Sequence, residues 1–173
     1  MQRIKFEDLP KEKLAELARM YAHNWQTLDG LWFKHVETEF GLPAAEKIDL
    51  RNWEKQSVIE AQRIKKVLGL EQGGLSSVLT VLSFMSWQVV SPSFEFEQES
   101  PQKVVFFYPD CPIQEGRKRM GKADFSCKTM KTMLLTNIAR VAEPRAKVRC
   151  LSCPPDPHPQ HYWCKWELTL EKV

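Results

Sequence analysis

The spacing of apolar residues predicts that the first 70 positions are helical. From Leu14 to Val36, apolar side chains recur at steps of three or four, which places them on one face of a helix. We expect Asp8 to cap the start of this helix. Asp29-Gly30 is expected to interrupt it, giving one kinked helix or two helices. Gly41-Leu42-Pro43 ends it and opens a second helix, whose core side is a weaker stripe of Leu50, Trp53, Ile64, Val67 and Leu68.

The pattern changes after position 73. The segment 75–87 is apolar nearly all round over the length of a helix, which predicts a buried helix. In the segment 93–100, Phe94 and Phe96 alternate with glutamates, as in a half-buried strand. The segment 103–109 is rich in β-branched and aromatic residues, so these two segments predict a β-hairpin.

Four further segments complete the chain. Residues 110–121 predict a short, basic helical or irregular piece, and residues 127–144 an amphipathic helix. Residues 145–153 and 162–173 predict two strands joined by a proline-rich loop. In the last strand Cys164, Trp166, Leu168 and Leu170 share one face.

This order of elements predicts an α+β fold. The helices at 1–73 come first, followed by a hairpin, a helix and a second hairpin in 74–173. Such an order favours an antiparallel sheet packed on helices. The length suits a single domain over 1–173, with a helical N-terminal part and an α+β part that ends in a cysteine-rich hairpin.

Composition and charge limit the kinds of partner and the cellular location that we expect. The net charge is only +3, and it is concentrated in residues 111–173, which carry +6 and all five cysteines. This charge argues against a nucleic-acid partner, which would favour a longer basic stripe. No segment approaches the ~20 apolar residues of a membrane span. The N-terminus lacks an export signal, so we expect a cytoplasmic protein with reduced thiols.

The cysteines predict a thiolate-rich site. If the last two strands pair, Cys153 and Cys164 close the two sides of one loop, a geometry from which Zn²⁺ collects two thiolates. Further ligands would come from Cys111, Cys127, His158 or His161. Prolines between positions 154 and 159 stiffen this loop and limit the entropy lost when its ends are fixed. An iron–sulfur cluster, or cysteines that simply pack in the core, are the alternatives.

The same region also suits nucleophilic catalysis by a cysteine or the binding of an anion. Basic residues and a helix start both lower a thiol's pKa, so Cys127 is a candidate nucleophile with His158 or His161 as its acid–base partner. The basic cluster of Arg117, Arg119 and Lys128 is a candidate anion site at that helix start. A solvated basic face is the plainer reading of these residues. The role of Cys150 is open, because in an extended strand it points away from Cys153.

One acid in the helical region is also notable. Asp29 lies beside Trp32 and Phe33, and an acid beside aromatic rings suits an amine-bearing ligand. A helix kink with aromatic residues in the core is the reading that the pattern favours.

Three stretches resemble a known family. "DGLWF…VE…FG" at 29–41, "CPIQEGRKRMG…CK" at 111–128 and "CLSCPPDPHP…WCKW" at 150–166 resemble a bacterial and archaeal family of cytosolic proteins. That family is similar to the L-2-amino-thiazoline-4-carboxylic acid hydrolase-like proteins and to the four-vinyl reductase (hydrocarbon-binding) domain. The resemblance implies an α+β fold with an apolar pocket. It also implies a zinc site with Cys153 and Cys164 as ligands and Cys127 as the third.

These observations lead to three functional hypotheses. The first is a domain that binds a small hydrophobic or acidic molecule and carries a zinc site of Cys111, Cys127, Cys153 and Cys164. The second is a hydrolase acting on a small cyclic or amide C–N bond through a metal-bound water or Cys127. The third is a structural zinc protein within a complex. Six tryptophans and the helical stripe also make a homodimer a prediction.

Overall fold

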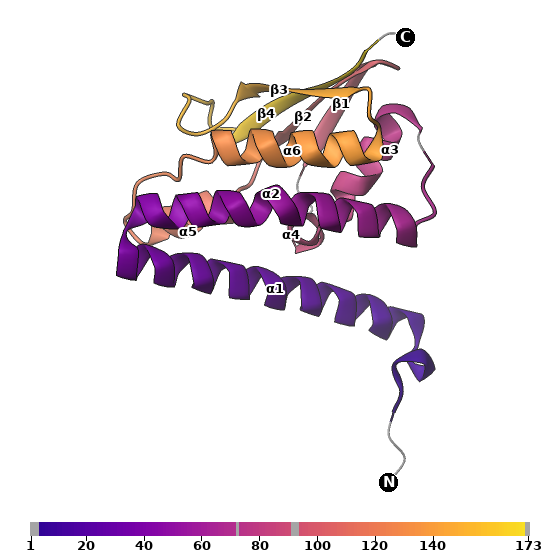
Figure 1. Cartoon of the computed structure of the whole chain (residues 1–173), viewed down its shortest axis with the longest axis horizontal. Coiled ribbons are helices and arrows are strands. Elements are labelled where there is room, and N and C mark those ends of the chain that lie inside the picture. Colours follow the sequence, from indigo (N-terminus) through magenta and orange to yellow (C-terminus); the bar gives the residue numbers. More distant parts are fainter. Residues whose placement is uncertain (1–3, 72, 91–93, 172–173) are drawn as a thin grey trace.

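The computed structural model describes residues 4–71, 73–90 and 94–171, and it confirms the α+β class. Helices precede most of the strands (Figure 1). The helical elements are η1 (Phe6–Asp8, a 3-10 turn), α1 (Lys11–Phe40), α2 (Leu42–Val67), α3 (Gly74–Ser83), α4 (Ser86–Val90), α5 (Pro112–Arg119) and α6 (Lys128–Ala142). The strands are β1 (Glu95–Ser100), β2 (Lys103–Tyr108), β3 (Ala146–Ser152) and β4 (Cys164–Leu170).

The four strands form one antiparallel sheet in the order β1-β2-β4-β3. Its two hairpins join through β2 and β4, where Tyr108 pairs with Cys164 and Phe106 with Trp166. Because side chains alternate along a strand, these residues lie on one face of the sheet. That face is apolar and buried, as the pattern in the last strand predicts.

The helices cover this apolar face in layers (Figure 1). Helix α6 lies against the sheet together with α3, α2 lies beyond α6, and α1 is the outermost layer. Leu135, Ile138 and Ala139 of α6 are at most 1% exposed. Helix α6 therefore contacts the sheet on one side and α2 on the other.

The first helix differs from expectation at two points. Helix α1 runs unbroken from Lys11 to Phe40, so Asp29-Gly30 does not interrupt it. A glycine inside a helix costs only about 1 kcal/mol, which the packing of α1 on α2 and α4 offsets. Asp8 does not cap α1, because it belongs to η1 and Pro10 precedes the helix without a side-chain cap. Gly41, with φ of 81°, ends α1 and leads directly into α2, as predicted.

Two other predicted elements also differ from expectation. The segment 75–87 contains two helices, because the chain breaks at Phe84 and Met85. The Ser86 N–H, at the start of α4, donates to the Glu60 carboxylate at 2.6 Å, which fixes a new helix start. Strand β1 is exposed over most of its length, and Phe96 is 53% exposed, because β1 forms an edge of the sheet. Positions 93, 172 and 173 of the predicted strands lie outside the described residues.

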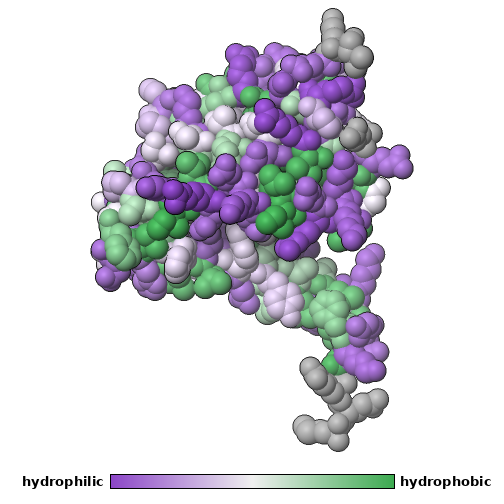
Figure 2. All heavy atoms as spheres, in the orientation of Figure 1, coloured by the Kyte–Doolittle hydropathy of each residue, from purple (hydrophilic) through white to green (hydrophobic). Residues whose placement is uncertain are grey.

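Apolar side chains remain on the surface. In Figure 2, green side chains lie between purple ones over the helical layers. The exposed apolar residues on α1 include Leu28, Leu31, Trp32 and Phe40. A homodimer through this helix stays a prediction.

None of the helices in the described residues combines the length and the apolar character that crossing a membrane requires.

A buried carboxylate ties α3 to the turn between α6 and β3. Glu143 is 2% exposed and accepts hydrogen bonds from the Gly74 N–H at 3.2 Å and from the Arg145 guanidinium at 2.9 Å. The Arg145 side chain lowers the pKa of Glu143 to about 2. The ionised carboxylate thus stabilises the junction of helix and sheet.

We predict that Glu143→Gln lowers the free energy of unfolding by about 1–2 kcal/mol at pH 7. The folded-state pKa of Glu143 lies below its ordinary value of 4.5, so its contribution is present above pH 4.5 and is lost as pH falls towards 2. Urea denaturation from pH 3 to 7 measures this difference. Glu171→Gln, which removes an exposed partner of Lys147, is the control, and an equal effect of both variants would contradict the prediction.

Candidate functional site

A partly open cavity of about 390 Å³ lies between the helices and one end of the sheet. It begins where the paired residues Tyr108 and Cys164 end the apolar face of β2 and β4. Helices α1, α2, α4, α5 and α6 supply the remaining walls. Aromatic side chains dominate these walls: Trp25, Phe33, Trp53, Trp87, Tyr108 and Phe125.

Three of these indoles form a continuous row. The ring centroids of Trp25 and Trp53 lie 5.4 Å apart, and those of Trp53 and Trp87 lie 5.3 Å apart. Both pairs meet edge to face at 80°, which is a favoured arrangement for aromatic rings. The row connects α1 to α4 through α2 along one wall of the cavity.

A lysine projects into the cavity from α6. The Lys131 ammonium lies 4.6 Å from the ring centroid of Tyr108 and 5.0 Å from that of Trp87. No salt bridge joins Lys131 to an acid among the described residues. Burial lowers the pKa of Lys131, but Tyr108 and neighbouring thiols, first that of Cys164, outweigh it and raise the pKa overall. The ammonium is therefore charged at neutral pH and is compensated by aromatic faces rather than by a carboxylate.

The same end of the cavity holds an unused donor. The indole Nε1 of Trp87 is buried and makes no well-formed hydrogen bond among the described residues, although it lies close enough to the Tyr108 phenol to favour that group's ionised form slightly. Burial also raises the pKa of the Tyr108 phenol, which therefore stays protonated. Lys131, Trp87 and Tyr108 together make this end rich in donors.

Two carboxyl groups line the cavity on its α1–α2 side. Burial raises the pKa of Asp29. Burial, and then repulsion from Asp29, raise the pKa of Asp49 to about 7, although the Trp53 indole donates to it. Neither acid has a salt-bridge partner in the part of the chain that the structure describes. Their ionised forms are costly in the empty cavity.

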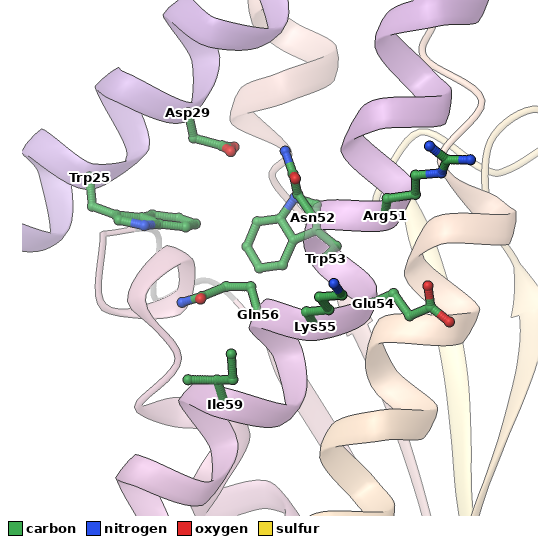
Figure 3. Close-up of a pocket in the computed structure, with 9 residues that line it drawn as sticks. All are labelled: Trp25, Asp29, Arg51, Asn52, Trp53, Glu54, Lys55, Gln56 and Ile59. Carbon is green, nitrogen blue, oxygen red and sulfur yellow. The ribbon is translucent and has the colours of Figure 1, made fainter.

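An open groove of about 700 Å³ adjoins this side of the cavity (Figure 3). It shares Trp25, Asp29 and Trp53 with the cavity. In Figure 3, Asp29 of α1 and Asn52 of α2 point toward each other across the space between the two helices. Long polar side chains make up much of the rest of the groove: Arg51, Glu54, Lys55 and Gln56.

Three thiols meet beside the cavity. The Sγ atoms of Cys127 and Cys153 are 3.6 Å apart, and the Cys153 thiol also interacts with that of Cys164. Hydrogen bonding from Cys153 lowers the pKa of both Cys127 and Cys164, while the pKa of Cys153 itself is raised. As they stand, His, Cys, Asp and Glu side chains of the described residues form no group of three or more that could hold a metal ion.

The proline-rich loop is held against the start of α6. The Lys128 backbone N–H donates to the Pro154 carbonyl at 3.1 Å, and the Lys128 ammonium pairs with Asp156 at 2.7 Å. The Cys153 N–H donates to the same carboxylate at 3.4 Å. These contacts bring Cys153 next to Cys127, which immediately precedes α6.

The other predicted residues are dispersed. Cys111 lines the cavity, and burial raises its pKa to about 11. Cys150 lies on β3 opposite Trp166, with a pKa raised by burial. Among the contacts of the described residues, neither His158 nor His161 hydrogen-bonds to a cysteine: the His158 ring lies tilted against Trp163, and His161 meets Tyr162 edge to face. Of the predicted anion site, Arg117 pairs with Glu37, Lys128 with Asp156, and Arg119 is exposed.

A family profile spans nearly the whole chain. The profile of the family of unknown function DUF6125 matches residues 7–170. The chain belongs to this family. Among curated proteins, none matches the sequence of this DUF6125 member.

One solved structure is similar to this DUF6125 chain. It is the crystal structure of the phenol-responsive sensory domain of the transcription activator PoxR with phenol. The TM-score is 0.46 at 14% identity, with 98% of this chain and 77% of that chain covered. So distant a similarity says nothing about the ligand or activity of the DUF6125 chain. Neither finding supports the resemblance to thiazoline hydrolases or to the four-vinyl reductase domain.

Sequence reasoning missed the charged groups that the cavity encloses. In the sequence, Lys131 is one of several lysines on a predicted amphipathic helix, and Asp49 lies in a stretch rich in charged residues. The indoles that enclose them come from three different helices. The one hint in the sequence is Asp29 beside aromatic residues, where the pattern favoured a helix kink.

We predict that Asp49→Asn stabilises the protein at alkaline pH. The pKa of Asp49 is raised in the folded state, so its stabilising effect is complete below pH 3.8 and is lost as pH rises through about 7. At pH 8 the variant should therefore exceed the wild type by about 2–4 kcal/mol, with little difference at pH 4. Chemical denaturation at both pH values measures this. The matched control is Glu39→Gln on the exposed side of α1, and parallel pH profiles for Asp49→Asn and the wild type would refute the prediction.

Proposed function

We propose that this DUF6125 protein binds a small aromatic or apolar molecule carrying an acidic group, within the aromatic cavity. The observation that carries the proposal is the Lys131 ammonium. It projects into a largely apolar cavity and has no carboxylate partner among the described residues. Enclosed cavities with a few polar groups are the usual form of small-molecule sites.

The energetics favour an anionic ligand at this end. Burial removes water from the Lys131 ammonium, and the Tyr108 and thiol groups that raise its pKa provide no carboxylate partner. Cation–π contacts with Tyr108 and Trp87 compensate only part of that loss, on the order of 1–2 kcal/mol. A carboxylate or phenolate would pair with Lys131 and accept from the unused Trp87 N–H. Such a group thus satisfies two donors at once.

The volume limits the size of the ligand. About 390 Å³ lies near the lower end of the range of roughly 300–1,000 Å³ for small-molecule pockets. This volume suits a molecule with a single ring. The indole rings suit a ligand with an aromatic ring, which can pack on them in a stacked or an edge-to-face arrangement.

We predict that small aromatic carboxylates bind to the wild type and bind at least about tenfold more weakly to Lys131→Met, because a charge-assisted hydrogen bond is lost while side-chain volume is kept. Benzoate, phenylacetate and 3-phenylpropionate are suitable probes. Tryptophan fluorescence and calorimetry measure the affinity, since Trp25, Trp53 and Trp87 line the cavity.

Arg140→Met is the matched control. It removes a positive charge from an exposed position of the same helix, so we expect its affinities to equal those of the wild type. Absence of binding by every probe, or equal loss in Lys131→Met and Arg140→Met, would count against the acid-binding cavity.

We also propose that Cys127, Cys153 and Cys164 bind zinc, with Cys111 as the fourth ligand. Two thiolates on one tetrahedral Zn²⁺, each at ~2.3 Å, lie about 3.8 Å apart. The 3.6 Å between Cys127 and Cys153 is close to that separation. Cys164 already interacts with Cys153, whereas Cys111, which lines the cavity, would have to reorient. The ion would join the β3–β4 loop to the start of α6, so its role would be structural.

We predict about one equivalent of zinc in the wild-type protein and less than about 0.2 in Cys153→Ser. Elemental analysis measures the metal, and cobalt substitution should give the strong absorption of a tetrahedral thiolate site. Cys150→Ser is the control, because Cys150 lies on β3 and is expected to leave the zinc content unchanged.

The same purified protein also distinguishes the zinc site from an iron–sulfur cluster and from a catalytic thiol. A brown protein with bound iron would indicate an iron–sulfur cluster. A metal-free protein whose Cys127 alkylates rapidly at pH 7 would contradict the zinc site and favour the hydrolase, in which that thiol is the nucleophile. The lowered pKa of Cys127 and its place in the cavity wall are the observations on the side of the hydrolase.

A further inference from the structure

Three charged groups around the cavity have no ion-pair partner among the described residues. Arg117 and Lys122 both pair with Glu37, at 3.4 and 2.8 Å. Lys34 and Asp110 are exposed. What remains inside, among the described residues, is Lys131 on one side and the two carboxyl groups of Asp29 and Asp49 on the other.

We propose that Asp29 and Asp49, with the faces of Trp25 and Trp53, hold a protonated amine, so that the ligand is amphoteric. Its acidic group lies at Lys131 and its ammonium group at the α1–α2 side, with an apolar body between. This inference rests on the proposed function for the acidic end and extends it to the opposite end.

The aromatic surroundings point to an ammonium group. Organic cations are attracted to the faces of tryptophan rings and to carboxylates at the same time. Asp29 lies one helical turn from Trp25, and Asp49 one turn from Trp53, so each acid shares a face of its helix with an indole. A hard metal ion would instead require several oxygen ligands, which this indole-rich wall does not supply.

The charged groups at the two ends of the cavity do not pair with each other among the described residues. No salt bridge links Lys131 to Asp29 or Asp49 among the described residues, and the groups that raise the Lys131 pKa are Tyr108 and cysteine thiols. The indole row lies between them, with centroid spacings of 5.4 and 5.3 Å from Trp25 to Trp53 to Trp87. Opposite charges enclosed in one cavity without neutralising each other match a ligand that carries the complementary pair.

The acids are also accessible from outside. Asp29 belongs to both the cavity and the open groove of Figure 3, where Asn52 points toward it. A cationic ligand entering through the groove would therefore meet a carboxylate first. Repulsion between the two carboxylates, which disfavours ionising both, would be relieved by a bound ammonium.

Three probes of matched shape test the inference at pH 8. They are 4-(aminomethyl)phenylacetate, with both charges, 4-ethylphenylacetate, with the acid alone, and 4-ethylbenzylamine, with the amine alone. We expect the doubly charged probe to bind the wild type at least about tenfold more tightly than the acid alone. In Asp29→Asn/Asp49→Asn, the ratio of these two affinities should fall to about one. Calorimetry measures the dissociation constants, with Glu39→Gln as the charge-matched control and thermal melts to verify folding.

The outcomes separate this inference from the proposed function. A ratio near one in the wild type, with 4-ethylphenylacetate still dependent on Lys131, overturns the amine site and leaves the acid-binding cavity intact. A high ratio that persists in the double variant also overturns the assignment to Asp29 and Asp49. Failure of all three probes to bind the wild type overturns both proposals. Binding of 4-ethylbenzylamine that is lost in the double variant supports the amine site independently.

Discussion

The packing of α6 between the sheet and α2 is the contact on which the rest of the structure depends. One side of α6 fills the apolar face of β3 and β4, and the other supports the outer helical layers. The first turn of α6 lies against the β3–β4 loop, near the point where the paired residues Tyr108 and Cys164 end the apolar face. Core side chains do not fill the space there, and Cys127 and Lys131 face it. The cavity thus lies at the end of the apolar face, between the start of α6 and the other helices.

The pairing of charged groups differs between the core and the cavity. In the core, the buried Glu143 carboxylate is paired with Arg145 and accepts from the Gly74 N–H. Around the cavity, an ammonium and two carboxyl groups are partly buried without ion-pair partners among the described residues. Proteins tolerate such violations mainly at functional sites, where stability is sacrificed for binding. The contrast between Glu143 and the cavity groups supports the proposal that the cavity is a binding site.

Periodicity in the sequence predicted most of the fold, because each stripe or alternation extends over several turns or residues. The hairpin–helix–hairpin order and the single apolar face of β4 followed from it directly. The helix break at Phe84 did not, because it depends on Glu60, a residue 26 positions from Ser86. The cavity could not be predicted either. Lys131 has the sequence context of a solvent-exposed lysine, and only the tertiary placement of Trp87 and Tyr108 shows otherwise.

The thiols and the cavity are parts of one structure. Cys127 and Cys164 line the cavity and also contact Cys153, so their positions set part of its wall. Both thiols also help to raise the pKa of Lys131, which lies on the next turn of α6 after Cys127. A zinc ion bound by three or four thiolates forms a centre of net negative charge, which would help to keep the nearby Lys131 ammonium charged. Because the sulfurs hold the proline-rich loop and the helix start together, their state would also fix the shape of the acid-binding end. The thiol cluster thus governs both the geometry and the charge of the site, even if it takes no part in chemistry.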